Sequence, residues 1–207
     1  TRALELCRQL GETPLLFWAL LGQVVYLVRA ELKAARELAE QLLSLAQNNH
    51  NPVFIVQAHM ILGQILLHLG EFAQAREHLE EGIALYDPEQ FRSLRHLQDQ
   101  KVTCLSFAAC ALWFLGYPDQ AQQRSHDALT LAYELSHPFS LGYALSFSAT
   151  VHQLRREVRP VQEQRALITL ATEQGFPIYL ALERIWQGWA LAVQGQIEEG
   201  ISQIRQG

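Results

Sequence analysis

The stretch LGEFAQA at Leu69–Ala75 decides the fold, because it recurs as LGYPDQA at Leu115–Ala121. In both copies an apolar helix end is followed by glycine, which readily adopts the left-handed conformation that ends a helix. An amphipathic stretch follows, and an alanine five residues after the glycine is small enough to let two helices cross closely. The pattern predicts repeated helix–turn–helix pairs.

A second marker recurs out of phase with the first. Ser44–Pro52 (SLAQNNHNP), Thr130–Pro138 (TLAYELSHP) and Thr169–Pro177 (TLATEQGFP) each read as a helix end, a polar turn and a proline. Proline is tolerated in the first turn of the next helix. Together with Pro14, these prolines stand 38, 86 and 39 residues apart, and 86 is twice 43. About five repeats with a period of about 38–46 residues are therefore predicted.

We predict an all-α fold, a right-handed α-solenoid of antiparallel helix pairs that covers residues 1–207 as a single array. A helix remnant at 1–11 precedes units at about 13–51, 52–96, 97–137, 138–176 and 177–207. Each unit holds an A helix (about 14–28, 53–69, 97–115, 138–154 and 177–194) and then a B helix (about 31–48, 71–86, 118–135, 159–174 and 197 to the end). A loop insertion is expected at 87–98. Acidic residues such as Glu31, Glu71 and Asp119 are expected to open B helices, where the helix dipole favours negative charge.

Composition and charge restrict the classes of function. With 49% apolar and 18% charged residues, the chain can bury a continuous core and is not expected to be disordered. The formal net charge of −5 leaves no broad positive field for a phosphate backbone, so we expect no nucleic-acid partner. The most apolar stretch, 14–28, falls short of the roughly 20 apolar residues that span a bilayer, so we expect no membrane partner.

The three cysteines, Cys7, Cys104 and Cys110, indicate reduced, buried thiols and a cytoplasmic location, and they form no secretory disulfide framework. The sequence begins with threonine inside one helical pattern and stops inside another. We therefore expect it to be a fragment of a longer protein.

The units carry a repeat signature. The first unit reads W-x-x-L-G at Trp18–Gly22, and the second reads H-x-x-L-G at His59–Gly63, followed by the glycine and alanine described above. This order of aromatic residue, Leu-Gly, Gly and Ala resembles the tetratricopeptide-repeat family, which implies stacked helix pairs that bind proteins. The period exceeds the family norm of about 34 residues, and the third unit has Ala108-Ala109 in place of Leu-Gly.

This longer variant is similar to the helical repeats of bacterial STAND-class signalling ATPases and of maltose-regulon type transcription activators. The run CLSFAACALWFLGYPDQAQQRSHDALTLAYELSHPFSLGYALSFSATVHQLRRE, Cys104–Glu157, looks particularly like the region downstream of the ATPase module in proteins that also carry class III nucleotide cyclase or protein kinase domains. The resemblance implies a sensor or docking arm whose nucleotide chemistry lies elsewhere in the parent protein. These 207 residues contain no Gly-rich phosphate loop that ends in Gly-Lys-Ser or Gly-Lys-Thr.

No constellation of residues indicates catalysis. The eight histidines form no H-E-x-x-H pair and C-x-x-C is absent, so ordinary helix and turn histidines are favoured over a metal site. His59, at the aromatic position of the signature, is expected to pack between helices. Arg155, Arg156 and Arg159 cluster at one turn, where we favour a solvated turn over an acidic partner. We predict no enzyme activity, no cofactor and no metal.

The inner face of the superhelix is the candidate binding surface. A helices present this face, and its expected positions carry aromatic, amide, imidazole and apolar side chains. They are Gln23, Tyr26, Met60, Gln64, His68, Ser106, Cys110, Trp113, Phe114, Leu145, His152, Gln153, Ile185 and Trp189. Such a surface is either an open groove for a partner or core formed by tight winding, and both interpretations stay open.

Two functions are compatible with this surface. We favour protein–protein interaction, in which the chain is a regulatory scaffold that docks on other domains of its parent or on another protein. The alternative is small-molecule sensing, in which Gln64, His68, Trp113, His152 and Trp189 line a pocket. Docking requires a long open groove, whereas sensing requires a closed pocket with converging polar groups.

Overall fold

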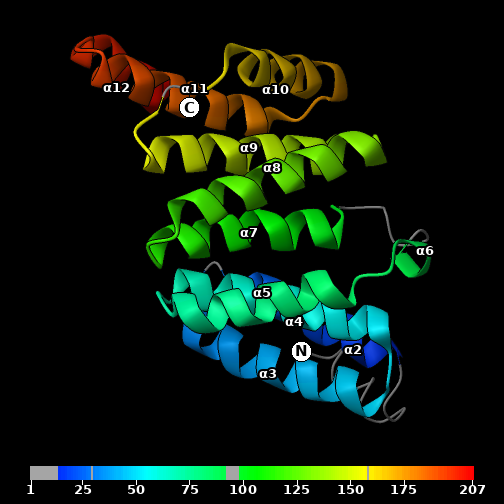
Figure 1. Ribbon diagram of the computed structural model, residues 1–207. Coiled ribbons are helices and arrows are strands. Elements are labelled where there is room, and N and C mark those ends of the chain that lie inside the picture. The colour runs from blue at the N-terminus through cyan, green and yellow to red at the C-terminus, as the bar shows by residue number, and fades with distance from the viewer. Residues whose placement is uncertain (1–13, 29, 92–97, 158) are drawn as a thin grey trace. The chain divides into compact units, whose positions relative to one another are not determined.

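The computed structural model describes residues 14–28, 30–91, 98–157 and 159–207, and every regular element in these ranges is a helix (Figure 1). The helices are α2 (Pro14–Leu27), α3 (Leu32–Asn48), α4 (Pro52–His68), α5 (Phe72–Leu85), α6 (Pro88–Phe91), α7 (Gln100–Phe114), α8 (Pro118–Leu135), α9 (Pro138–Leu154), α10 (Val161–Gln174), α11 (Pro177–Val193) and α12 (Ile197–Gln206). The chain divides into two compact units, Thr1–Leu94 and Arg95–Gly207. The predicted helix remnant at 1–11 and Cys7 lie outside the described residues. None of the helices in the described ranges has the length and hydropathy that crossing a bilayer requires.

Prolines and side-chain caps start the helices. Pro52, Pro138 and Pro177 are the first residues of α4, α9 and α11, as the sequence predicts, because proline in the first turn loses no helical hydrogen bond. The Asn51 side chain caps α4 by accepting hydrogen bonds from the backbone N–H groups two and three residues later, at 3.1 and 3.2 Å. The start of α4 is therefore fixed by two adjacent residues.

Residues with a left-handed backbone conformation (positive φ) form several of the turns between helices. Gly70 and Gly116 follow α4 and α7 with φ of 80° and 85°, which confirms the predicted turns. His50, Ser136 and Arg156 adopt the same region with φ of 48°, 49° and 57°. Because a Cβ atom is disfavoured there by roughly 1–2 kcal/mol, packing of the adjoining helices has to hold these three turns in place.

Acidic residues open two B helices without capping them. Glu31 and Glu71 are the N-cap residues of α3 and α5, and neither side chain accepts a cap hydrogen bond. Glu71 instead accepts a 2.7 Å hydrogen bond from Arg36, which also donates to Glu40 at 2.8 Å. The carboxylate therefore links the start of α5 to α3.

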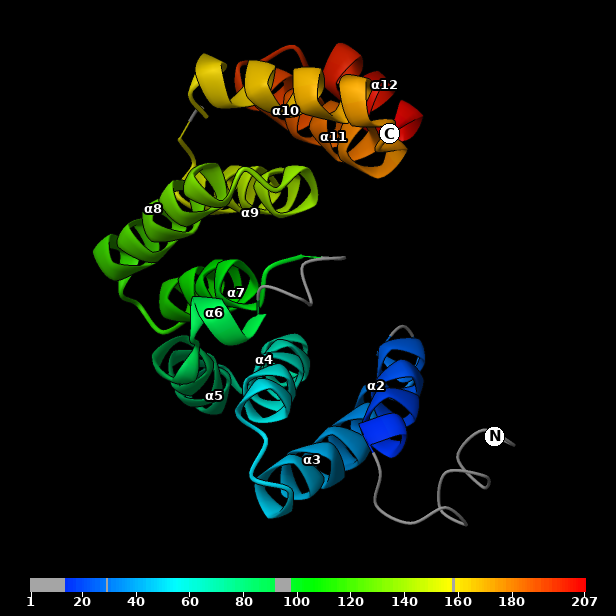
Figure 2. The same ribbon diagram turned by 90° about the vertical axis from the view of Figure 1, so that its right-hand side faces the viewer.

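In the first unit, α4 packs against α3 and α5 (Figure 2). Phe17 of α2 and Phe54 of α4 stack with ring centroids 4.0 Å apart. At the α4–α5 crossing, a Cβ atom on Gly63 would lie 2.6 Å from Cγ of Leu79, so the α4 backbone lies directly against this side chain. The short helix α6 lies inside the predicted loop insertion at 87–98.

In the second unit, α9 packs against α7, α8, α10 and α11, and α11 packs against α12. Residues 102–112 of α7 are all buried, because small or apolar side chains occupy every face of this helix. The backbones of α11 and α12 meet at Gly188 and Gly200. A Cβ atom on either glycine would lie 2.5 or 2.4 Å from the carbonyl oxygen of the other.

The predicted all-α fold of consecutive helix pairs is confirmed within both units. The single array, the unit borders and the handedness of the superhelix stay predictions.

Candidate functional site

The residues predicted for the inner face differ widely in exposure. Three are exposed: Tyr26, His68 and Phe114. Seven are half-buried: Gln23, Gln64, Trp113, His152, Gln153, Ile185 and Trp189. Four are between 0% and 5% exposed: Met60, Ser106, Cys110 and Leu145.

Of the two interpretations that the sequence leaves open, core formation applies to Met60, Ser106, Cys110 and Leu145, because all four are buried. The Ser106 hydroxyl donates a 2.8 Å hydrogen bond to the carbonyl oxygen four residues earlier, so it is buried with its polar group satisfied. Burial raises the pKa of the Cys110 thiol to about 12, so the sulfur stays protonated and unreactive. Leu145 belongs to the apolar cluster of the second unit.

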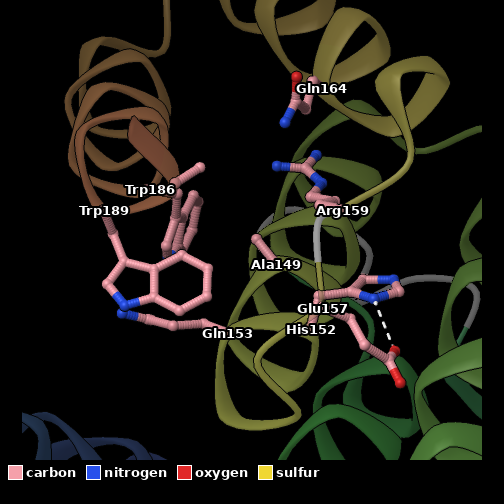
Figure 3. Close-up of a pocket in the computed structure, with 9 residues that line it drawn as sticks. Ala149, His152, Gln153, Glu157, Arg159, Gln164, Trp186 and Trp189 are labelled. Atoms are coloured by element: carbon pink, nitrogen blue, oxygen red, sulfur yellow. Dashed lines mark ion pairs between the residues drawn. The ribbon is translucent and has the colours of Figure 1, made fainter. Parts of the chain in front are cut away.

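Three of the half-buried residues meet at a pocket in the second unit (Figure 3). His152 and Gln153 reach it from α9, and Trp189 reaches it from α11. The other lining residues are Ala149, Glu157, Arg159, Gln164, Trp186 and Ala190. Its cavity volume is only about 20 Å³, and its total empty volume of about 290 Å³ includes space that is open to solvent. The pocket therefore lies between α9, α10 and α11.

Two tryptophans form one wall of this pocket. Trp186 and Trp189 lie three positions apart on α11, and such side chains share a helix face. The Gln153 side chain lies beside Trp189, and Arg159 lies across the pocket from both rings (Figure 3). The sequence prediction includes Trp189 and omits Trp186, although the spacing is visible in the segment IWQGW.

Arg159 is a buried cation on the opposite wall. Its Nη1 donates to Oε2 of Glu183 at 2.7 Å, and its Nη2 donates to the carbonyl oxygen of Glu163 at 2.7 Å. Its Nε lies 3.5 Å from Oε2 of Glu163, and that oxygen accepts a 2.6 Å hydrogen bond from Ser148. The Arg159 side chain is only 5% exposed, so the prediction of a solvated turn is wrong for this residue.

A second group of charges borders the pocket. Arg155 lies on the turn after α9, and its Nε donates a hydrogen bond to Oε1 of Glu157 at 2.9 Å. This hydrogen bond lowers the pKa of Glu157. Nδ1 of His152 lies 3.6 Å from Oε2 of the same carboxylate. Glu157 is therefore a charged group that already has a cationic partner.

The pocket presents aromatic and amide groups without an unpaired charge. Arg159, which lines the pocket, pairs with Glu183, and the lining residue Glu157 pairs with Arg155. Its remaining polar groups include the amides of Gln153 and Gln164. Aromatic rings with a few amides suit apolar side chains and peptide groups. Among the described residues, no group of three or more His, Cys, Asp or Glu side chains could hold a metal ion.

Of the residues predicted from the sequence to line a ligand pocket, three belong to the second unit. His152 and Trp189 meet at this pocket, whereas Trp113 does not line it. Gln64 and His68 belong to the first unit, where Nδ1 of His68 lies 2.7 Å from the carbonyl oxygen of Gln64 in the same helix.

Comparisons with known proteins support the repeat assignment. The profile of the tetratricopeptide repeat matches residues 56–81, which lie in the α4–α5 hairpin and include the H-x-x-L-G signature at His59–Gly63. A comparison with curated protein sequences found no match. The chain thus contains a tetratricopeptide repeat, and the predicted resemblance is confirmed for this hairpin.

Proposed function

We propose that the chain is a protein-binding scaffold and that its docking surface lies on the A helices of the second unit. Tetratricopeptide repeats generally bind proteins, and one such repeat is present. We define the docking surface as Trp113 and Phe114 of α7, His152 and Gln153 of α9, and Ile185 and Trp189 of α11. The incompletely buried aromatic rings carry the proposal, and Phe114 is 50% exposed. Since α9 packs against both α7 and α11, the three helices form one layer.

The charges favour an uncharged, apolar segment as the partner. Arg155 and Arg159 are held by Glu157 and Glu183, so neither guanidinium group is available to clamp an acidic terminus. Amide side chains such as Gln153 can exchange hydrogen bonds with the backbone of a bound segment. Burial of 200 Å² of apolar surface would contribute roughly 5 kcal/mol before ordering costs. Because association itself costs several kcal/mol, measurable binding requires a segment that buries more apolar surface than this or adds hydrogen bonds.

We further propose that this segment belongs to the parent protein, a bacterial signalling ATPase. The resemblance of Cys104–Glu157 to the region downstream of such ATPase modules supports this proposal. The chain would then be a cytoplasmic docking arm without catalysis, cofactor, nucleic acid or membrane contact of its own, and the nucleotide chemistry would belong to other domains.

Titration calorimetry of the chain against the remaining domains of the parent protein tests both proposals. Trp189→Ala is expected to weaken binding about 30-fold, which corresponds to about 2 kcal/mol for an aromatic anchor. Tyr133→Ala is the matched control, because Tyr133 is 51% exposed on the B helix α8. It removes an exposed aromatic ring outside the docking surface, so its affinity should equal that of the unsubstituted chain.

Two outcomes contradict these proposals separately. Binding that Trp189→Ala leaves unchanged contradicts the docking surface. Absence of binding to every parent domain contradicts the docking arm and favours the second candidate function, small-molecule sensing at the pocket of Figure 3. In that case, small neutral ligands that enter the pocket should change the fluorescence of Trp186 and Trp189, and Trp186→Phe should reduce the change.

A further inference from the structure

Two histidines face each other inside the α4–α5 hairpin. His59 of α4 and His78 of α5 place their Nδ1 atoms 3.0 Å apart, and their ring centroids are 5.1 Å apart. His59 is 9% exposed, and His78 is half-buried. The pair is shielded from water on most sides, so its protonation is coupled to the packing of the two helices.

Proton counting limits the states of this pair. A hydrogen bond between two Nδ1 atoms needs one proton, so one ring is the donor and the other presents a bare nitrogen. The neutral pair therefore combines the Nδ1–H tautomer of one ring with the Nε2–H tautomer of the other. When both rings are protonated, two N–H groups face each other, the hydrogen bond is lost and two positive charges meet in a poorly solvated place.

Carboxylates on the surrounding helices raise the pKa of the two histidines, but this effect is weaker than that of burial, which lowers it. Glu77 and Glu81 of α5 and Glu40 of α3 favour the protonated rings, but Glu40 is already paired with Arg36 at 2.8 Å. α2 carries no charged side chain between Pro14 and Leu27. Burial is the largest influence on both rings and lowers the pKa of each.

We propose that His59 and His78 form an acid-sensitive latch that holds α4 and α5 together when neutral and releases them when both rings are protonated. An unfolded histidine has a pKa of about 6.5, and each folded pKa is lower. The stabilising contribution is therefore fully present above about pH 6.5 and is lost as the pH falls through the folded values. This latch lies in the first unit and is independent of the docking surface.

The rings themselves provide the first test. Long-range proton–nitrogen NMR spectra of the labelled chain at neutral pH should show one ring as the Nδ1–H tautomer and the other as the Nε2–H tautomer. Both should titrate below about pH 6.5, the value of an unfolded histidine, in two separated steps, because the first proton opposes the second. Identical tautomers, or titration of both rings at the value of an unfolded histidine, would overturn the latch.

Hydrogen exchange of backbone amides provides the second test. After correction for intrinsic exchange, the opening constant of α4 and α5 should rise as the pH falls below about 6.5, by up to about tenfold per pH unit for each extra proton. His78→Phe keeps an aromatic ring and removes one of the two titrating groups, so it should reduce this dependence from two extra protons toward one, whereas His126→Gln at an exposed position of α8 should leave it unchanged. An equal pH dependence in all three proteins would overturn the proposal. If His78→Phe does not fold, the tautomers of the unsubstituted chain decide.

Discussion

Replacement of Gly63 by alanine tests the direct contact between α4 and α5. The added Cβ atom would lie 2.6 and 2.8 Å from Cγ and Cδ2 of Leu79, and 3.2 Å from the carbonyl oxygen of Ala75. Leu79 is 0% exposed, and overpacking of a closed core costs about 1–3 kcal/mol. Alanine favours a helix over glycine by about 1 kcal/mol. The expected net destabilisation is therefore up to about 2 kcal/mol.

Gly22 is the matched control for this substitution. It occupies the same Leu-Gly position of the repeat signature in α2, but a Cβ atom there would meet no described atom within 4 Å. Gly22→Ala should therefore stabilise the chain by about 0.5–1 kcal/mol through helix propensity alone. Since propensity is common to both variants, their difference measures the overpacking at Gly63, about 1–3 kcal/mol.

Urea unfolding followed by far-UV circular dichroism gives the total stability of each variant, and hydrogen exchange locates the change in α4 and α5. Leu79→Ala alone should cost about 2–5 kcal/mol because it leaves a cavity. The added methyl group of Gly63→Ala can occupy part of that cavity, so the double variant should be more stable than the sum of the single changes predicts. If Gly63→Ala stabilises the chain as much as Gly22→Ala, the two helices are not in contact at this position.

Three further predictions concern the charged network, the buried thiol and a helix cap. Glu183→Leu leaves the guanidinium of Arg159 without its main partner and should lower the free energy of urea unfolding by about 3 kcal/mol. The double variant with Arg159→Met should regain most of this loss. A loss below about 1 kcal/mol for Glu183→Leu would contradict a buried ion pair. Because burial raises the pKa of Cys110 to about 12, iodoacetamide should leave this thiol unmodified at neutral pH in the folded chain and modify it in urea, as peptide mass spectrometry can show; modification without urea would contradict its burial. Asn51→Ala removes the cap of α4 and should cost about 1 kcal/mol in the same unfolding assay, and an unchanged midpoint would show that the proline beside it suffices.

Helix boundaries could be predicted because their signals are local. The A helix predicted at 53–69 is α4, Pro52–His68, and the B helix predicted at 118–135 is α8, Pro118–Leu135, because proline and glycine set helix ends through the backbone itself. The B helix expected from 159 begins at Val161 instead, because Pro160 is its N-cap residue with an extended ψ of 131° and the residue before a proline is disfavoured in the helical region. The ion pair between Arg159 and Glu183 spans 24 residues, and no local pattern encodes it.

The candidate surface was harder to predict, because the position of a residue in the repeat does not show whether its side chain is exposed in a groove or buried in the core. Ser106 and Cys110 stand at groove positions, but α7 carries small or apolar residues on every face, which indicates a helix buried all round. That composition could have assigned both residues to the core. His59 and His78 are 19 residues apart in the sequence. Their contact depends on how the two helices of the hairpin align, and the residues next to each histidine do not indicate that alignment.

The all-round burial of α7 has a consequence for how such a chain can change over time. Ala108, Ala109 and Ala111 are each fully buried, and alanine has no side-chain rotamers to lose on folding. Folding therefore orders these three side chains at little entropic cost. Because they are already small and closely packed, there is almost no space around them for additional atoms. A larger side chain at these positions would push the packed helices apart. Substitutions tolerated there are therefore restricted to small residues such as Gly, Ala, Ser and Cys, whereas exposed positions tolerate more changes.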